Sequence, residues 1–421
     1  MPNRFAQLTI LGAIAISLAS PVSSRAADKT PISFYVFGDL AEKAAYQTLV
    51  TAFSQKHPEI DVNMVYSAGE DEFPSPDGED AYRARLSLDF ASSKAPDVFL
   101  INYREYGIFG EKGQLEPVGQ YLTHSTVIQA GDFYPQAMAA FTRNNVLDCI
   151  PQNLSGTVVY YNKDLFQKAK RDWPKANWTW DDFLSTAQAL TDTTHEQYGL
   201  GVDPSFARLM PFIWQNKGEV TDIPPTKIAM DSPAVSEAMQ WFVDLLGKYH
   251  VIPDETHVKA QNVEDRFLAG TEAMLIFSRR IVPSLRLASF DWDVAPLPQR
   301  QQAATLQYSD GYCMARSSPN HAAAWTLIEY ANSIEGQTIL AKTGRTVPSL
   351  KAVANSPIFL DPTKKPLNSQ VFLDIIPTMR TAPLLANYAD LEETINQQLE
   401  STFYGDQGVA AAIKAIGENT K

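Results

Sequence analysis

Strand-like and helix-like patterns alternate along the first hundred residues, after a short apolar start. Residues 32–37 and 60–66 are rich in β-branched and aromatic side chains, and residues 96–101 form a third apolar run. Between these segments, residues 41–57 and 81–93 place apolar side chains at helical spacing. This order of strand, helix, strand, helix and strand predicts a mostly parallel α/β sheet.

Polar residues at helix starts organise the second half of the chain. Thr179, with Asp182 three residues later, resembles a capping box, and Ser232 before Pro233 is a typical helix start. Residues 317–333 repeat the Ser-Pro start. Because capping accounts for Thr179 and Asp182, we assign neither to a functional site. The helix that begins at Ser232 is predicted to bury Val235, Met239, Phe242, Val243 and Leu246. The helix in residues 317–333 is predicted to bury Ala324, Leu327, Ile328 and Ala331.

Length and charge narrow the choice of protein class. A chain of 421 residues is too long for one small core, so we expect two domains. The net charge of −13 argues against nucleic acid or an anionic membrane surface as a partner. A small anionic ligand is not excluded, because a local arginine cluster can outweigh the global charge.

The amino terminus has the pattern of an export signal. Arg4 precedes an apolar stretch at residues 5–19, and Ser24 and Ala26 are the small residues that a signal peptidase requires. We therefore expect cleavage after Ala26. A membrane anchor would need about 18–20 apolar residues. No cysteine lies near the cleavage site, so we expect a periplasmic protein without a lipid anchor.

The chain has two cysteines, Cys149 and Cys313. In an exported protein they either pair with each other or both remain free. A disulfide that closes so long a loop would stabilise the fold by about 5 kcal/mol in the chain-entropy model. Free cysteines, however, are often buried. The residues alone leave both alternatives open.

The sequence lacks the local signatures of metal centres and of common catalytic sites. Its six histidines show no metal-ligand spacing, and it has no HExxH, CxxC, GxSxG, Walker A or GxGxxG motif. A glycosidase needs two carboxylates at a set separation. The sequence offers two such pairs, Asp181-Asp182 and Asp291 with Asp293. Asp182 is explained as a cap, however, and the second pair flanks Trp292 at a strand start. We expect no cofactor, no metal and no catalytic residue.

Hydrogen-bonding side chains gather where ligands bind α/β sheets, beyond the carboxyl ends of the strands. Asp39 follows the first predicted strand, residues 67–71 the second, and Asn-Tyr-Arg at 102–104 the third. Gln152, Asn153 and Ser155 form a further polar interruption, just before an apolar run, that a core strand does not require. These positions favour recognition of a ligand over catalysis.

Two further groups suit recognition of a sugar or an anion. Trp214 lies beside Gln215 and Asn216, which fits a ring that stacks on a sugar next to amides that bind its hydroxyls. A core tryptophan explains this pattern equally well. Arg279-Arg280 and Arg345 are together suited to charge-assisted hydrogen bonds with hydroxyls, a carboxylate or a phosphate.

An ordered series of motifs resembles the family 1 extracellular solute-binding proteins of bacterial ABC importers, the sugar-binding group. The resemblance spans nearly the whole mature chain. It is carried by LVTAFSQKHPEIDV, KAPDVFLINYREYGIFGEKGQLEPV, VVYYNKDLF, WTWDDF, YGLG, DRFLAGTEAML, WDVAPLP and NHAAAWTLIEYANSIEGQTIL. It implies two α/β lobes, each with a central, mostly parallel sheet flanked by helices, joined by a multi-crossing hinge. The ligand is then held between the lobes, and the closed form docks on a membrane permease.

The resemblance also implies a division of the chain. The expected first lobe comprises residues 27–148 and 313–355, and the second comprises residues 149–312 and 356–421. Hinge crossings are expected near residues 149–153 and 309–313. Because the two crossings lie side by side in the family, we predict a Cys149–Cys313 disulfide.

Ligand contacts carried over from the family form one set. Its members are Asp39, Asn102, Tyr103, Arg104, Gln152, Asn153, Ser155, Trp214, Asn216, Arg279, Arg280, Asp310, Tyr312 and Arg345. Receptors for long oligosaccharides line the cleft with several tryptophans, whereas only Trp214 stands out here. We therefore expect a monomeric receptor for a mono- or disaccharide or a polyol derivative. The alternatives are an anionic sugar or sugar phosphate held by Arg279, Arg280 and Arg345, and a secreted carbohydrate-active hydrolase or lyase.

Overall fold

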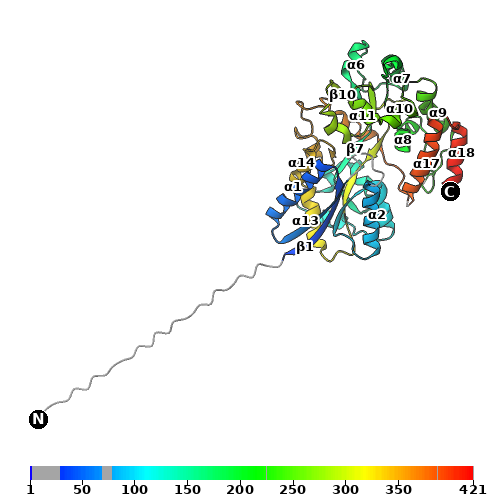
Figure 1. The fold of residues 1–421 in the computed structure, drawn as a ribbon. Helices are drawn as coiled ribbons and strands as arrows, with labels where there is room; N and C mark the ends of the chain where they lie inside the picture. Colours follow the sequence, from blue (N-terminus) through cyan, green and yellow to red (C-terminus); the bar gives the residue numbers. More distant parts are fainter. Residues whose placement is uncertain (2–28, 69–77, 224, 386, 421) are drawn as a thin grey trace.

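The computed structural model describes residues 1, 29–68, 78–223, 225–385 and 387–420. The predicted signal peptide and residues 69–77, which include part of the predicted polar segment 67–71, lie outside the described residues. The chain forms two α/β lobes stacked end to end (Figure 1), as predicted. Within the described ranges, none of the helices combines the length and apolar character needed to cross a membrane.

The first lobe is built on a five-stranded sheet in the order β2-β1-β3-β12-β6. β1 (Thr30–Gly38), β2 (Ile60–Ala68) and β3 (Val98–Asn102) run parallel, which confirms the sequence prediction. β12 (Asp310–Met314) pairs with β3 in the antiparallel direction, and β6 (Cys149–Pro151) pairs with β12 in the antiparallel direction. A segment from late in the chain thus completes a sheet begun at its start.

Helices cover this sheet because their apolar faces follow helical spacing. In α1 (Leu40–Lys56), the side chains of Tyr46, Leu49 and Phe53 are buried against the sheet. α1 lies on one side of β1 together with α13 (His321–Ala331) and α14 (Ile334–Ala341), whereas α2 (Gly78–Ala91) lies on the other (Figure 1). The lobe also includes α3 (Tyr103–Glu111), α4 (Gly119–His124), α5 (Pro135–Ala140), β4 (Thr142–Arg143) and β5 (Val146–Leu147).

The predicted Ser-Pro start of α13 is wrong by two residues. The helix begins at His321, after Asn320, and the four predicted core residues are buried. The Ser318 hydroxyl donates to the Asp97 carboxylate and accepts from the Asn320 amide. Ser318 therefore anchors the preceding turn to the edge of β3 instead of capping the helix.

The second lobe contains most of the helices and a three-stranded sheet in the order β10-β8-β9. This sheet is antiparallel, so the prediction of a mostly parallel sheet in each lobe is wrong for the second lobe. Its strands are β8 (Val158–Asn162), β9 (Met274–Phe277) and β10 (Trp292–Pro296). Its helices are α6 (Lys163–Lys168), α7 (Trp180–Leu190), α8 (Phe206–Gln215), α9 (Pro233–Gly247), α10 (Glu255–Ala260), α11 (Val263–Leu268), α12 (Val282–Leu285), α17 (Tyr388–Phe403) and α18 (Val409–Asn419). The Thr179–Asp182 capping box of α7 and the Ser232 cap of α9 are both present, as predicted.

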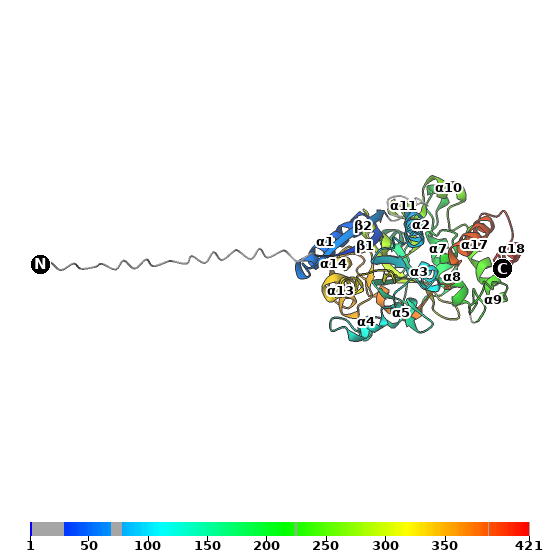
Figure 2. The same ribbon diagram turned by 90° about the horizontal axis from the view of Figure 1, so that it is seen from below.

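Four short strands join the lobes in the order β13-β7-β11-β14. β7 (Asn153–Gly156) continues from β6, and β11 (Thr305–Tyr308) leads into β12, so two chain crossings run side by side. β13 (Val347–Pro348) and β14 (Met379–Arg380) flank them, with α15 (Lys351–Ala354) and α16 (Val371–Asp374) in between along the chain. Figure 2, from below, shows the two lobes as one continuous elongated body.

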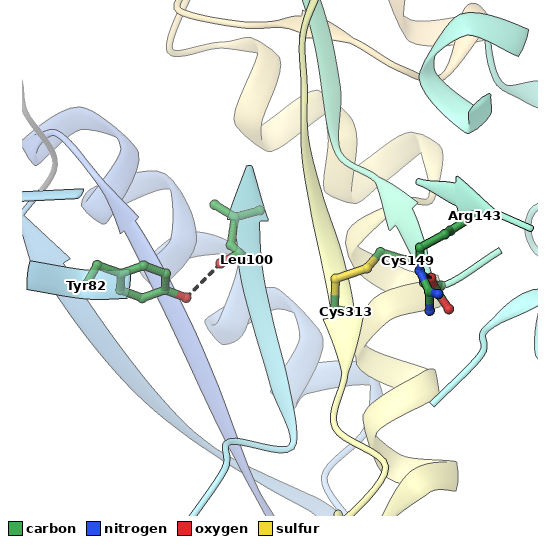
Figure 3. Close-up of a disulfide and its surroundings, with 6 residues drawn as sticks. Tyr82, Leu100, Arg143, Cys149 and Cys313 are labelled. Carbon is green, nitrogen blue, oxygen red and sulfur yellow. Dashed lines mark hydrogen bonds and ion pairs between the residues drawn. A yellow bond between two sulfur atoms is a disulfide. The ribbon is translucent and has the colours of Figure 1, made fainter. Parts of the chain in front are cut away.

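Cys149 and Cys313 form a disulfide between β6 and β12, which confirms the predicted pairing (Figure 3). The two residues are directly opposed in the antiparallel ladder, with Cα atoms 4.4 Å apart. This is close to the roughly 4.5 Å spacing of a non-hydrogen-bonded antiparallel pair. Both side chains are fully buried. The disulfide therefore ties the two crossing segments together inside the sheet of the first lobe.

Candidate functional site

A cavity of about 350 Å³ lies at the junction of the lobes. Side chains from the carboxyl ends of β1 and β3, from the crossing strands, and from α8, α11 and the end of β9 line it. Seven of the predicted ligand contacts meet here: Asn102, Arg104, Asn153, Ser155, Arg280, Asp310 and Arg345. The sheet edge and the crossings thus converge on one space, although their residues are far apart in the sequence.

The alternation of a β-strand explains the polar interruption before β8. Asn153 and Ser155 point into the cavity from β7. The side-chain nitrogen Nε2 of Gln152 instead donates to the Tyr46 hydroxyl at 2.9 Å, and Leu154 is fully buried. Successive side chains of a strand face opposite sides. Two of the three predicted polar residues therefore face the cavity, and Gln152 lies behind it against α1.

Asp310 joins three of the segments that form the cavity. Its carboxylate accepts from Asn153 Nδ2 at 2.9 Å and from Asn102 Nδ2 at 3.2 Å. Its backbone amide donates to Asn153 Oδ1 at 3.1 Å. Burial raises the pKa of Asp310, although the hydrogen bond from Asn153 opposes the shift. One carboxylate therefore fixes the orientation of both amides that face the cavity.

A cluster of three charged side chains lies at the first lobe's side of the cavity, where Glu42 and Arg345 line it and the predicted contact Asp39 does not. Asp39 caps α1 and forms a capping box with Glu42. Arg345 reaches both carboxylates, with Nη1 at 2.9 Å from Asp39 Oδ2 and Nε at 3.1 Å from Glu42 Oε2. Burial raises the pKa of Glu42 to about 7, although the charge of Arg345 opposes the shift. Arg345 is thus held by protein carboxylates at the cavity wall.

We expect the Glu42→Gln variant to gain stability over the unsubstituted protein as the pH rises from 5 to 8. The pKa of Glu42 is raised from its ordinary value of 4.5 to about 7, so the folded protein binds more protons than the unfolded chain between these two pH values. The contribution of Glu42 to stability is then lost as the pH rises through this window. The difference in the free energy of unfolding between Glu42→Gln and the unsubstituted protein should change by about 2–3 kcal/mol from pH 5 to pH 8.

Urea denaturation of both proteins at pH 5 and pH 8 measures this difference. Glu393→Gln is the matched control, because Glu393 is an exposed glutamate on α17. A stability difference between Glu42→Gln and the unsubstituted protein that is the same at both pH values would contradict the prediction.

Arg208 organises the wall of the second lobe. It lies in the first turn of α8, where Nε donates to Asp203 Oδ1 at 3.0 Å and Nη1 donates to the Tyr308 hydroxyl at 3.0 Å. Its guanidinium carbon lies 4.8 Å from the centre of the Phe277 ring. Arg208 thus fixes two aromatic side chains that line the cavity. None of these residues was predicted, although an arginine inside the apolar run FARLMPFIW marks a buried charge with a specific partner.

Arg104 and Tyr103 have different roles. Arg104 lines the cavity, and its Nη1 lies 3.1 Å from both carboxylate oxygens of Glu392 on α17. Tyr103 is fully buried outside the cavity, and its hydroxyl accepts from the Ala382 amide at 2.7 Å. The predicted turn at 102–104 therefore contributes Asn102 and Arg104 to the cavity, and Tyr103 to packing against the other lobe.

Trp214 and Asn216 lie away from the cavity, contrary to the prediction. They are at the end of α8 opposite Arg208, about 9 Å along the helix at 1.5 Å per residue. Trp214 is buried, with the Arg380 guanidinium carbon 4.7 Å from its ring. Asn216 Nδ2 donates to the Ala234 carbonyl and to Glu237. The aromatic–amide pattern at 214–216 thus serves the core of the lobe.

Arg279 and Tyr312 are also buried outside the cavity. The Arg279 guanidinium carbon lies 4.3 Å from the Phe359 ring centre and 4.7 Å from that of Phe372. Burial lowers the pKa of Arg279 to about 9. Of the Arg279-Arg280 pair, only Arg280 lines the cavity. The three arginines therefore do not converge as a group. In the described part of the chain, no cluster of three or more potential ligands suits a metal ion.

Comparison with known proteins agrees with this architecture. The model of the bacterial extracellular solute-binding protein family matches residues 38–338. An ABC substrate-binding protein from Listeria monocytogenes, solved in complex with cycloalternan, superposes with a TM-score of 0.83 at 26% identity, covering 93% of this chain and 98% of that chain.

Two relatives show how far the sequences have diverged. A putative binding protein of Brucella abortus is 21% identical over 347 residues, which is 80% of this chain and 81% of the relative. The maltotriose-binding protein of Pyrococcus abyssi is 23% identical over 323 residues, covering 75% of this chain and 66% of the relative.

Proposed function

The chain belongs to the bacterial extracellular solute-binding proteins, and on that basis we propose that it captures a small uncharged carbohydrate between its lobes for delivery to an ABC permease. Proteins of this family are transport receptors and not enzymes, so the hydrolase or lyase alternative is excluded. The ligand we propose is a mono- or disaccharide or a polyol derivative.

The observation that carries this proposal is the composition of the cavity. Amide and hydroxyl groups from Asn102, Asn153 and Ser155 meet the rings of Phe277 and Tyr308 in one space. Sugars need both components, because their C–H faces stack on aromatic rings while their hydroxyls form hydrogen bonds. A volume of about 350 Å³ is near the lower end of the roughly 300–1,000 Å³ typical of ligand pockets. This favours a small sugar over a long oligosaccharide.

The charges at the cavity favour an uncharged ligand. Arg345 is paired with Asp39 and Glu42, Arg208 with Asp203, and Arg104 with Glu392. The carboxyl groups of Glu42, Asp203, Glu264 and Asp310 line the same space. A phosphate or carboxylate would have to compete with these groups for the guanidinium side chains of Arg104, Arg208 and Arg345. This argument weighs against the alternative ligand, an anionic sugar or sugar phosphate.

We further propose that the ligand acts by closing the lobes. The predicted division gives residues 27–148 and 313–355 to the first lobe and 149–312 and 356–421 to the second. Because β6 (Cys149–Pro151) and β12 (Asp310–Met314) pair within the sheet of the first lobe, we move the boundary beyond them and place the hinge at the crossing strands β7 and β11. A ligand that contacts both walls only in the closed state favours that state. Export with cleavage after Ala26 would release a monomeric receptor into the periplasm without a lipid anchor.

A thermal-shift screen tests the proposed function. The panel contains maltose, mannitol and D-tagatose as neutral probes, and sn-glycerol 3-phosphate and glucose 6-phosphate as anionic ones. A neutral probe present at about 100 times its Kd should stabilise the folded protein by about 2.7 kcal/mol. A shift with the phosphorylated probes alone would overturn the uncharged ligand, and chemical conversion of any probe would overturn the receptor function.

A further inference from the structure

Glu264 is a cavity-lining carboxylate that the fold does not use elsewhere. It lies in the first turn of α11. In the described structure, no side chain of another residue is hydrogen-bonded or ion-paired with its carboxylate. Arg208, the cation whose charge acts on it, is already held by Asp203 and the Tyr308 hydroxyl. Burial raises the pKa of Glu264, and the neighbouring Asp203 adds to the shift.

The other carboxyl groups of the cavity have structural partners. Glu42 holds Arg345 and completes the capping box of α1, Asp203 holds Arg208, and Asp310 binds the amides of Asn102 and Asn153. Glu264 is not required as a cap, because Asn262 Oδ1 already accepts from the Asp265 amide at 2.8 Å. A partly buried carboxylate without such a partner is costly to the folded protein unless something else binds it.

We infer that Glu264 is a specificity-determining residue whose carboxylate accepts hydrogen bonds from two adjacent hydroxyl groups of the bound carbohydrate. This inference rests on the proposed function. An ionised carboxylate offers two acceptor oxygens and no donor, which matches a pair of neighbouring hydroxyls. Hydrogen bonds to an ionised group are roughly twice as strong as those between neutral groups. The same charge repels a phosphate or carboxylate on the ligand, so Glu264 selects against phosphorylated sugars.

The Glu264→Gln variant tests this role with little change of shape. Glutamine keeps one acceptor oxygen and replaces the other with a donor that cannot accept from a hydroxyl. The matched control is Asp265→Asn. This substitution removes an exposed charge from the same first turn of α11, and so reproduces any effect on the helix dipole.

Isothermal titration calorimetry with maltose, mannitol and D-tagatose, and with the two phosphorylated probes, gives the affinities. We expect Glu264→Gln to bind the neutral probe that stabilises the unsubstituted protein 10- to 100-fold more weakly, in the range of about 1.5–3 kcal/mol for a charged hydrogen bond. Asp265→Asn should bind it within about twofold. The ratio of neutral to phosphorylated affinity should fall in Glu264→Gln alone.

The possible outcomes separate this inference from the function on which it rests. If the unsubstituted protein and Glu264→Gln bind the neutral probe equally well, the role of Glu264 is overturned and the receptor function stands. If Glu264→Gln and Asp265→Asn lose affinity to the same extent, the loss comes from removing a negative charge at the start of α11, and the role of Glu264 is again overturned. If only phosphorylated probes bind the unsubstituted protein, the uncharged ligand and the role of Glu264 both fail.

Discussion

Removing the Cys149–Cys313 disulfide is expected to lower the free energy of unfolding by about 5 kcal/mol, with little effect on ligand affinity. The two cysteines are 164 residues apart in the sequence. In the chain-entropy model, a cross-link over a loop of this length restricts the unfolded chain by about that amount. This exceeds what most single substitutions cost, which is about 0.5–3 kcal/mol.

The affinity should be preserved because the disulfide is not part of the cavity. It lies in the ladder between β6 and β12, inside the sheet of the first lobe. The chain reaches the cavity only beyond it, at Asn153 on one crossing and at Asp310 on the other. The rungs Gly311–Pro151 and Tyr312–Ile150 keep these segments paired without the covalent bond.

The measurement is urea denaturation of the oxidised protein and of a Cys149→Ala/Cys313→Ala double variant. Calorimetry with the neutral probe that binds then compares their affinities. Each single alanine variant serves as a control, since it also lacks the disulfide and should be destabilised by a similar amount. Mass mapping that finds both thiols free in the oxidised protein would contradict the bond itself. A large loss of affinity in a folded double variant would show that the disulfide also shapes the cavity.

Local patterns predicted those parts of the fold that depend on neighbours in the sequence. The first three strands and α1 follow from hydrophobic spacing, and the caps at Thr179 and Ser232 follow from residues within one helical turn. β12 could not be placed in this way, because its pairing with β3 joins residues more than 200 positions apart. The disulfide likewise came from the family resemblance, since two cysteines alone do not reveal whether they pair.

The residues of the candidate site likewise divide into those that a local sequence pattern predicted and those that depend on tertiary packing. Asn102 was identified because it follows a predicted strand, Asn153 because it lies in a polar interruption before an apolar run, and Arg345 as an arginine suited to charge-assisted hydrogen bonds. All three line the cavity. Trp214 was misplaced because a tryptophan beside amides has the same sequence pattern in a core as in a sugar site. Glu264 was missed because only the packing of α11 onto the cavity shows which way its side chain points. Side-chain direction on a helix is thus the information that the sequence lacks.

Replacing Asp310 by alanine should weaken binding of the neutral probe by at least about 100-fold. The carboxylate is a potential acceptor for the ligand, and a hydrogen bond to a charged group contributes about 1.5–3 kcal/mol. Asp310 also fixes the amide side chains of Asn102 and Asn153, which lose their orientation in the variant. The loss should therefore exceed that of Glu264→Gln, because three polar groups of the cavity change together.

The Asp310→Asn variant separates these two contributions. Asparagine has nearly the shape of aspartate, but only one of its two polar atoms can accept, so one of the amides of Asn102 and Asn153 faces a second donor. We expect an affinity between those of the unsubstituted protein and Asp310→Ala, whereas Asp265→Asn stays within about twofold. Circular dichroism verifies that each variant is folded before calorimetry. If a folded Asp310→Ala variant binds the neutral probe as well as the unsubstituted protein does, the junction of the two crossings does not form the ligand site, and the ligand must be sought elsewhere between the lobes.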